Sequence, residues 1–395
     1  MKKLRKKIYQ VLVGKNLFFL YYILILIRRF IFFKKKINIY KEKKKLKIIG
    51  RHNYDFFLGY YDINNISEDE TKILFHKKKK KSNIVDLCIY DVSTQLEEKI
   101  DESYAWSWQL GTRLQWVDHQ SIIYNYVQQN CLCSIILNLQ NNNKRILNYP
   151  IFSKSNNNKY YLNLNFQRLE NLRKGYGYCF DDNTINLKNY IRIIDLNKNK
   201  IIKIYDEIFF GNQLKKEIYQ DFYFNHLSWS PNSKHFIVYL ICSKTRSNKL
   251  IFFADFDQCR VLPYIKNISH HAWIDDTSIL FFGEINNCKN FYIFNLKNSS
   301  YKKLEFVNSN QDGHPYSLDG NKFIIDTYPD KFQTKKLYTY DLKNDLYEPI
   351  LDVFSNPYLI NSQKCDLHPK ISKQQNIIAF DTSHNKRREI ALLQK

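Results

Sequence analysis

The chain has 395 residues, of which 44% are hydrophobic and 16% aromatic, so it can bury a sizeable core. The formal net charge is +23, but residues 1–47 hold 16 Lys or Arg against one Glu, and five consecutive lysines follow at 77–81. The rest of the chain is nearly neutral. A folded domain that binds nucleic acid needs a basic face, so the charge distribution excludes a nucleic-acid partner.

Residues 1–44 come first in the chain and form a basic and apolar arm. Only 11 uninterrupted apolar residues run from Leu17 to Ile27 before Arg28 and Arg29, whereas a membrane-spanning helix needs about 20. No small-residue cleavage site follows, which argues against a removed signal peptide. We expect an amphipathic helix at a membrane surface, with Lys and Arg reaching anionic head groups. A tilted single span and a helix packed on the domain are the alternatives.

Residues 45–395 contain internal repeats, which indicate the fold. Each repeat has a polar or aromatic anchor, a turn rich in Asn, Asp or Ser, and then a run of apolar β-formers. The seven repeats are residues 59–76, 113–125, 176–196, 225–240, 269–283, 312–327 and 366–382.

Successive repeats lie about 40 to 60 residues apart, a period that is typical of a blade of four antiparallel strands. Helical periodicity is essentially absent after residue 50. The sequence therefore predicts an all-β protein, a β-propeller of about seven four-stranded blades. Six blades is the alternative, because the third repeat is the weakest. The segment KLKIIG at 45–50 is expected to pair with the last blade and close the ring.

The eight cysteines show no C-x-x-C pair and no dense disulfide framework. We interpret them as reduced and mostly buried thiols, which favours a cytoplasmic location.

Four histidines occupy the same position in four consecutive repeats, namely His226, His271, His314 and His368. The first strand of every propeller blade lines the central channel, so these side chains are predicted to converge on one rim. Neutral imidazoles with a carboxylate nearby suit a divalent cation such as Mn²⁺, Fe²⁺ or Zn²⁺. Asp312 and Asp366 each precede a histidine by two residues and are candidate ligands or partners that fix a tautomer.

Packing groups that bond to the neighbouring backbone are the alternative interpretation of these four histidines. The adjacent His270 is interpreted as a spare neighbour. The remaining histidines that follow turns or strand ends are expected to face solvent; they are His76, His119, His235 and His384.

Three motifs, NHLSWSP, DGHPYSLDGNKFIIDTYPD and CDLHPKISKQQNIIAFDTSHNKRREI, resemble the oligogalacturonate lyases and their relatives among the TolB-like propellers. GYYD, WSWQLGTRLQW and NFQRLENLRKGYGY are similar to relatives from bacterial surface-polysaccharide biosynthesis loci. The resemblance covers roughly residues 50–392. It implies a seven-bladed propeller that holds Mn²⁺ through histidines and a glutamine and cleaves an oligouronide by β-elimination. The implied ligands are His314 and His368, then His226 and His271, with Gln311 or Gln109 as the glutamine.

Such an elimination needs a group that binds the uronate carboxylate, a base for the proton at C5 and a donor for the leaving oxygen. Arginines can clamp a carboxylate with two hydrogen bonds, although an ion pair between blades is the alternative for each. The predicted catalytic residues are Arg113, Arg173, Tyr60 and Tyr61, and the predicted substrate-binding residues are His52, Asp62, Arg168, Tyr176 and Arg388.

The sequence therefore predicts a lyase-like protein that acts on or binds acidic glycans in surface-polysaccharide production, with a divalent metal, Mn²⁺ above others, in its channel. Its partners would be an acidic oligo- or polysaccharide and, through the arm, the cytoplasmic surface of the inner membrane. The alternative is a non-catalytic scaffold that gathers glycosyltransferases at that membrane. A glycosyltransferase or hydrolase is less favoured, because no paired carboxylates or nucleotide-sugar motif stand out. A fold alone does not choose among these functions.

Overall fold

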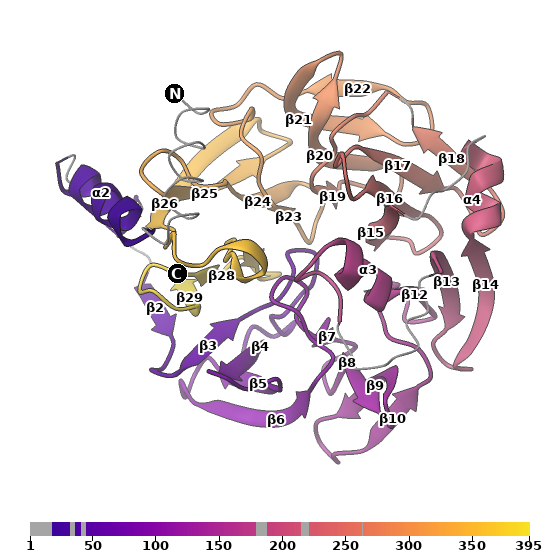
Figure 1. Ribbon diagram of the computed structural model, residues 1–395, viewed down its shortest axis with the longest axis horizontal. Coiled ribbons are helices and arrows are strands. Elements are labelled where there is room, and N and C mark those ends of the chain that lie inside the picture. The colour runs from indigo at the N-terminus through magenta and orange to yellow at the C-terminus, as the bar shows by residue number, and fades with distance from the viewer. Residues whose placement is uncertain (1–17, 32–35, 41–44, 179–187, 215–220, 263) are drawn as a thin grey trace.

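The computed structural model describes residues 18–31, 36–40, 45–178, 188–214, 221–262 and 264–395. These residues form seven antiparallel sheets arranged around a central axis, and Figure 1 looks along that axis. The chain is thus a seven-bladed β-propeller, as predicted from the repeats.

Each blade is a four-stranded meander whose first strand is innermost. The first blade comprises β3 (Tyr54–Phe57), β4 (Lys72–Lys79), β5 (Val85–Asp91) and β6 (Glu97–Ser103), and the second comprises β7 (Gln115–Trp116), β8 (Ser121–Gln128), β9 (Cys131–Asn138) and β10 (Lys144–Leu147). The third blade comprises β11 (Ser153–Lys154), β12 (Tyr160–Leu164), β13 (Tyr190–Asp195) and β14 (Lys200–Asp206). The fourth blade comprises β15 (Phe222–Trp229), β16 (Phe236–Cys242), β17 (Asn248–Phe253) and β18 (Cys259–Leu262). The last three blades comprise β19 (His271–Trp273), β20 (Ser278–Ile285), β21 (Cys288–Asn295) and β22 (Tyr301–Lys303); β23 (Pro315–Tyr316), β24 (Lys322–Asp326), β25 (Thr334–Asp341) and β26 (Leu346–Phe354); and β27 (Lys370–Ile371), β28 (Ile377–Thr382) and β29 (Glu389–Gln394), with β2 (Lys45–Ile49) as the outermost strand.

The ring closes where β2 pairs antiparallel with β29, with Ile49 opposite Ile390. The two ends of the propeller thereby share one blade, and the predicted pairing of residues 45–50 is confirmed. A short strand from the N-terminal arm, β1 (Ile37–Ile39), adds a fifth strand to the sixth blade by pairing with β26. The last part of the arm therefore belongs to the propeller.

The helix expected in the arm is present as α2 (Phe18–Ile31), at the rim of the disc beside β26 in Figure 1. Tyr21, Tyr22 and Ile25 are buried and form a small apolar cluster with Phe354. Among the described residues, no helix combines the length and the hydropathy that crossing a membrane requires.

Within the described residues after position 50 there are two α-helices and one short 3-10 helix, contrary to the prediction from periodicity. The α-helices are α3 (Phe166–Leu172), inserted between β12 and β13, and α4 (Glu207–Leu214), which follows β14; the 3-10 helix is η1 (Asn361–Gln363). The insertion of α3 separates the second and third strands of the third blade, and the repeat was therefore predicted too late in the chain. The third blade begins at β11 and not within residues 176–196. The number of blades was right, but the position of this repeat was wrong.

The core lies between adjacent blades, where β-branched and aromatic side chains fill both faces of each sheet. The seven cysteines within the described residues form no disulfide, and Cys179 lies outside those residues.

Candidate metal centre in the propeller channel

The channel has two ends, which the strand order distinguishes. Every innermost strand begins at one end, and because the strands are antiparallel, the turns between second and third strands return there. We call this end the entry mouth; it includes the segments 104–113, 175–178, 327–333 and 355–368. The opposite end, formed by the turns between first and second strands, is called the exit mouth.

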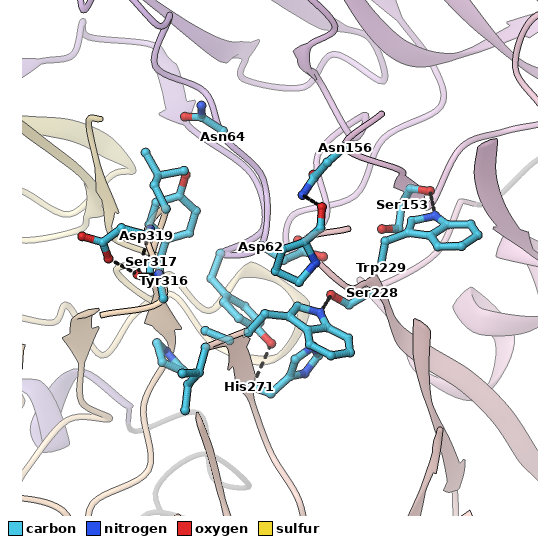
Figure 2. A pocket seen from close by; sticks show the side chains of 18 of the residues that line it. Asp62, Asn64, Ser153, Asn156, Ser228, Trp229, His271, Tyr316, Ser317 and Asp319 are labelled. Carbon is cyan, nitrogen blue, oxygen red and sulfur yellow. Dashed lines mark hydrogen bonds between the residues drawn. The ribbon is translucent and has the colours of Figure 1, made fainter. Parts of the chain in front are cut away.

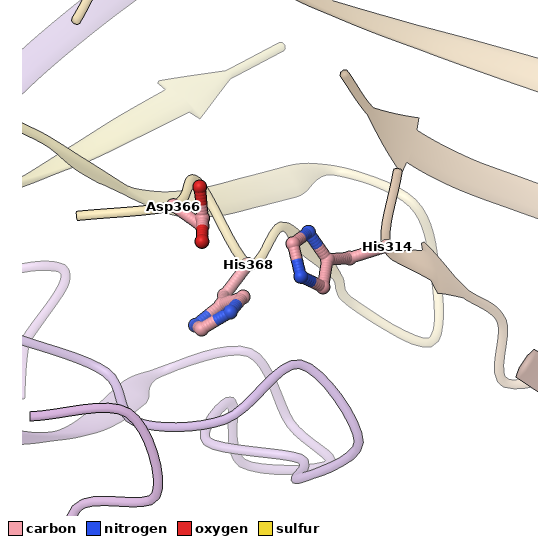
Figure 3. Close-up of side chains that lie close together, drawn as sticks. All are labelled: His314, Asp366 and His368. Atoms are coloured by element: carbon pink, nitrogen blue, oxygen red, sulfur yellow. The ribbon is translucent and has the colours of Figure 1, made fainter. Parts of the chain in front are cut away.

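His314, Asp366 and His368 come together at the entry mouth, just before strands β23 and β27 (Figure 3). Each side chain offers one ligand atom, and these atoms all lie within 4.8 Å of one another. All three residues are buried. Two imidazoles and a carboxylate are a donor set that suits Mn²⁺, Fe²⁺ or Zn²⁺.

Hydrogen bonds fix the tautomer of both imidazoles. Nδ1 of His314 donates to the Asp326 carboxylate at 2.9 Å, and Nδ1 of His368 donates to the carbonyl of Gly59 at 3.1 Å. Each ring therefore keeps the lone pair on Nε2 for a ligand. Nε2 of His368 is buried and has no hydrogen-bond partner among the described residues. Burial, followed by the neighbouring His314, holds the pKa of His368 well below its usual range, so the ring is neutral as a metal ligand must be.

Asp366 is ionised in this setting. Burial alone would raise the pKa of its carboxyl, but the ammonium groups of Lys335 and Lys364 outweigh burial and hold the pKa well below its usual range. The two lysine nitrogens lie 3.0 and 3.2 Å from Oδ1 of Asp366. The ionised carboxylate of Asp366 can therefore bind a cation, and the two ammonium groups beside it can attract an anionic substrate.

The other predicted histidines lie at different distances from this cluster. His271 was the predicted ligand, but it is the ring centroid of the neighbouring His270 that lies 4.0 Å from that of His314. The ring centroid of His226 lies 5.5 Å from that of His270. His271 instead accepts a hydrogen bond at Nδ1 from the hydroxyl of Tyr239 at 2.8 Å. Its ring also lines a cavity at the exit mouth.

Tyr60 and Tyr61 project into the channel from the segment after β3 and meet the histidines. The ring of Tyr60 lies 5.2 Å from His368, and that of Tyr61 lies 5.3 Å from His270. Burial raises the pKa of both phenols well above the usual value. Burial also raises the pKa of Tyr176, whose ring is 6.1 Å from Tyr60. At neutral pH these phenols are protonated, so they can donate a proton but are poor bases.

Three of the four predicted arginines are engaged within the protein. Arg113 forms a two-pronged ion pair with Asp62, both distances being 2.9 Å. The guanidinium of Arg168 donates to the Phe222 carbonyl, and that of Arg388 donates to the carbonyls of Trp108, Gln363 and Lys364.

Arg173 differs from the other three, because its guanidinium lies 4.6 Å from the ring centre of Tyr176 and is paired with no carboxylate among the described residues. It is the predicted arginine that can still meet a substrate carboxylate.

Several other predicted positions lie away from the centre. His52 is exposed in the turn between β2 and β3. Gln311 is also exposed, while Gln109 is buried and donates to the carbonyl of Lys364 at 2.7 Å.

Two histidines that were expected to face solvent, His76 and His384, are buried, so that prediction was wrong for them. His76 has a structural role, because its Nε2 accepts the backbone N–H of Thr112.

The backbone is strained at residues that face the channel. His226, His368 and Arg113 have φ angles of 52°, 43° and 58°, in the left-handed region that non-glycine residues seldom adopt. Such strain persists only where the surrounding structure imposes it, and it concentrates at functional sites.

A cavity of about 580 Å³ opens at the exit mouth (Figure 2). Its lining includes Trp229, Trp273 and Tyr316 and several carboxylates, among them Asp62 and Asp319. The Asp62 carboxylate is paired with Arg113, and Asp319 caps its own turn. Arg113 and Lys154 also line this cavity, so its lining carries charges of both signs and its charge does not decide for or against an acidic glycan.

A second cavity, of about 760 Å³, lies at the entry mouth. Tyr104, Trp106 and Trp108 line it together with Glu170 and Ser362. The ammonium of Lys78 lies 5.5 Å from the ring centres of both tryptophans. Aromatic faces beside a basic group suit a sugar ring that carries a carboxylate.

Asp326, Lys335, Lys364 and Tyr328 were not predicted as site residues from the sequence. A signal for Asp326 was present, because Asp326 and Asp381 lie at the ends of equivalent strands in the repeated patterns FIIDT and IAFDT. A carboxylate that recurs at the same buried position in two repeats indicates that it has the same structural role in both. Here each carboxylate accepts a hydrogen bond from a backbone N–H group, that of His314 for Asp326 and that of Leu58 for Asp381.

No protein-family model matches the chain, and no curated protein matches it. Among solved structures it is similar to the oligogalacturonate lyase of Vibrio parahaemolyticus, with a TM-score of 0.64 and 11% identity over 91% of this chain and 97% of the other. It is similar to an oligogalacturonate lyase in complex with manganese, also with a TM-score of 0.64, at 12% identity over 91% and 96%. TolB from Acinetobacter baumannii gives a TM-score of 0.42 at 14% identity over 82% and 80%. The two oligogalacturonate lyase structures establish that the chain shares their overall fold.

Proposed function

We propose that this protein binds a divalent metal ion, Mn²⁺ above others, at His314, Asp366 and His368 and acts on an acidic glycan by a lyase-like β-elimination. The observation that carries the proposal is Nε2 of His368, which is buried and has no hydrogen-bond partner among the described residues, on one of three side chains whose possible ligand atoms lie close together. A buried polar atom without a partner is costly unless something binds it.

The residues around the centre offer what the reaction needs. A bound cation would polarise the uronate carboxylate and thereby acidify the neighbouring C5–H. Arg173 and the half-exposed ammonium of Lys364 are placed to pair with that carboxylate. The neutral His270 can take the C5 proton, because Asp312 and Ser269 hold its Nδ1 and leave Nε2 to accept.

The elimination then follows from these roles. As the C5 proton leaves, its bonding electrons form the C4=C5 double bond and the C4–O bond breaks. A protonated phenol, Tyr60 or Tyr61, can deliver a proton to the leaving oxygen. The cavity lined by Trp106 and Trp108 would hold further sugar units of the same glycan.

An ultraviolet assay tests the reaction. The purified protein is incubated with Mn²⁺ and a panel of oligouronides and acidic bacterial polysaccharides, and absorbance from the unsaturated product is followed. We expect product with at least one substrate and a loss of at least roughly 100-fold in rate in His270→Ala and His314→Ala. The matched control is His119→Ala, at an exposed histidine outside the channel.

A non-catalytic scaffold in surface-polysaccharide production remains the second candidate. It is favoured by the internal hydrogen bonds that occupy Arg113, Arg168 and Arg388. This candidate predicts no unsaturated product from any glycan. It also predicts that His314→Ala still recovers glycosyltransferase partners from membranes as well as wild type does.

A further inference from the structure

One side of α2 is docked on the propeller, and the opposite side is apolar and exposed. Tyr21, Tyr22 and Ile25 are only 6–8% exposed, and the ring of Tyr22 lies 4.6 Å from that of Tyr358. At 3.6 residues per turn, the other apolar side chains fall on the far side of the helix. They are Phe19, Leu20, Ile23, Leu24, Leu26 and Ile27, each 38–57% exposed, and Phe30, which is 77% exposed.

Basic groups lie along the edge where α2 meets the propeller. The guanidinium of Arg28 and the ammonium of Lys331 lie 5.0 and 5.2 Å from the ring of Phe332, and the ammonium of Lys386 lies 5.5 Å from that of Tyr22. The sequence that follows the helix adds further lysines, at 34–36 and 43–45. An apolar helix side with basic flanks is the combination that binds anionic bilayers.

The loops that hold α2 also build the candidate metal centre. The turn 327–333 carries Phe332, which contacts the helix, and Tyr328, whose ring lies 5.7 Å from His314. The segment 355–368 likewise carries both Tyr358 and Asp366. The helix is therefore attached at the rim on the entry side of the propeller, the side that bears the metal centre, and not on the exit side.

We propose that α2 docks the protein on an anionic lipid bilayer through its exposed apolar side, so that the entry mouth lies on the bilayer side of the propeller. The exposed apolar side of α2 would therefore contact lipid directly. Where the proposed function also holds, the substrate is an acidic glycan carried on a membrane lipid, because the mouth that bears the metal centre is the one beside the bilayer.

Vesicle sedimentation tests the docking with the full chain. Vesicles of phosphatidylcholine alone are compared with vesicles in which about one third is phosphatidylglycerol. We expect binding to the anionic vesicles and at least tenfold weaker binding in the double variant Ile23→Glu and Leu24→Glu, because two apolar side chains on the exposed side of the helix become negatively charged. The matched control is Ile208→Glu in α4, a helical residue that is 73% exposed. It should bind like wild type.

Hydrogen exchange on the vesicle-bound protein tests the orientation. Amides in 328–333 and 384–387, at the entry mouth, should exchange more slowly than in the free protein. Those in the exit-mouth turns 317–320 and 373–376 should not change.

Three results would overturn the proposal: no binding to anionic vesicles, binding that the double variant retains, or protection at the exit mouth. A dimer that the double variant dissociates, without vesicle binding, would assign the helix surface to a second copy instead. Neither vesicle sedimentation nor hydrogen exchange uses a metal or a glycan, so a negative result in them would not contradict the proposed function. Likewise, a negative result in the ultraviolet assay would not contradict membrane docking through α2.

Discussion

Asp326 holds the ring of His314 in one tautomer, with its two carboxylate oxygens 2.9 and 3.1 Å from Nδ1. The same carboxylate accepts the backbone N–H groups of His314, Leu367 and His368. One side chain at the end of β24 therefore positions ligands that come from two adjacent blades.

Replacing Asp326 should weaken metal binding without removing a ligand. In Asp326→Asn the amide cannot serve all of these donors, so the imidazole of His314 loses its fixed orientation and the backbone at Leu367 and His368 loses an acceptor. We expect the metal affinity to fall roughly 10- to 100-fold, measured by titration of the metal-free protein with Mn²⁺ or Zn²⁺. Asp341→Asn, at the exposed end of the adjacent β25, is the control and should bind normally. Unchanged affinity in Asp326→Asn would show that the imidazoles need no such support.

Asp381 should make stability fall as the pH rises from 4 to 7. Burial raises the pKa of this carboxyl from 3.8 to about 7, despite the nearby Arg388. Between these values the unfolded chain releases the proton while the folded protein keeps it, so ionisation favours unfolding. Relative to Asp381→Asn, wild type should lose roughly 2 to 4 kcal/mol across this window and change little above pH 7. Urea unfolding at a series of pH values measures this difference. Parallel curves for the two proteins would refute the assignment.

The strand β2 should be needed for cooperative folding, whereas the residues before it should not. A chain that starts at residue 45 keeps β2 beside β29, and of the described elements it loses α2 and the added strand β1. A chain that starts at residue 51 leaves the edge of β29 unpaired and exposes Ile390, so it should be less stable by at least roughly 3 kcal/mol and prone to aggregate. Thermal unfolding and light scattering compare the two truncations. Equal stability would mean that the last blade closes without its fourth strand.

The repeats in the sequence were sufficient to predict the propeller, its seven blades and the closing strand, because each blade repeats one pattern of anchor, turn and apolar run. The helix α3 could not be anticipated from that pattern. It interrupts the third blade between β12 and β13, and its Asn165 cap and short length give a weak periodic signal.

The candidate site was predicted less completely, because position in a repeat does not determine where a side chain points. His270 and His271 are neighbours at the start of β19, yet only His270 lies against His314. His76 was expected at the surface, but it fills the space beside Gly111, which a sequence pattern does not reveal. Asp366 was recognised as a candidate ligand because it precedes a histidine by two residues, whereas Lys335 and Lys364, which keep it ionised, come from separate segments.

Elemental analysis of the purified protein tests the metal centre most directly, because it needs no substrate. We expect about one equivalent of a divalent metal, Mn²⁺ above others, in wild type after dialysis against metal-free buffer. We also expect strongly reduced metal in His314→Ala and His368→Ala variants that unfold as cooperatively as wild type. A wild-type protein that stays free of Mn²⁺, Fe²⁺ and Zn²⁺ even after incubation with each ion would contradict it.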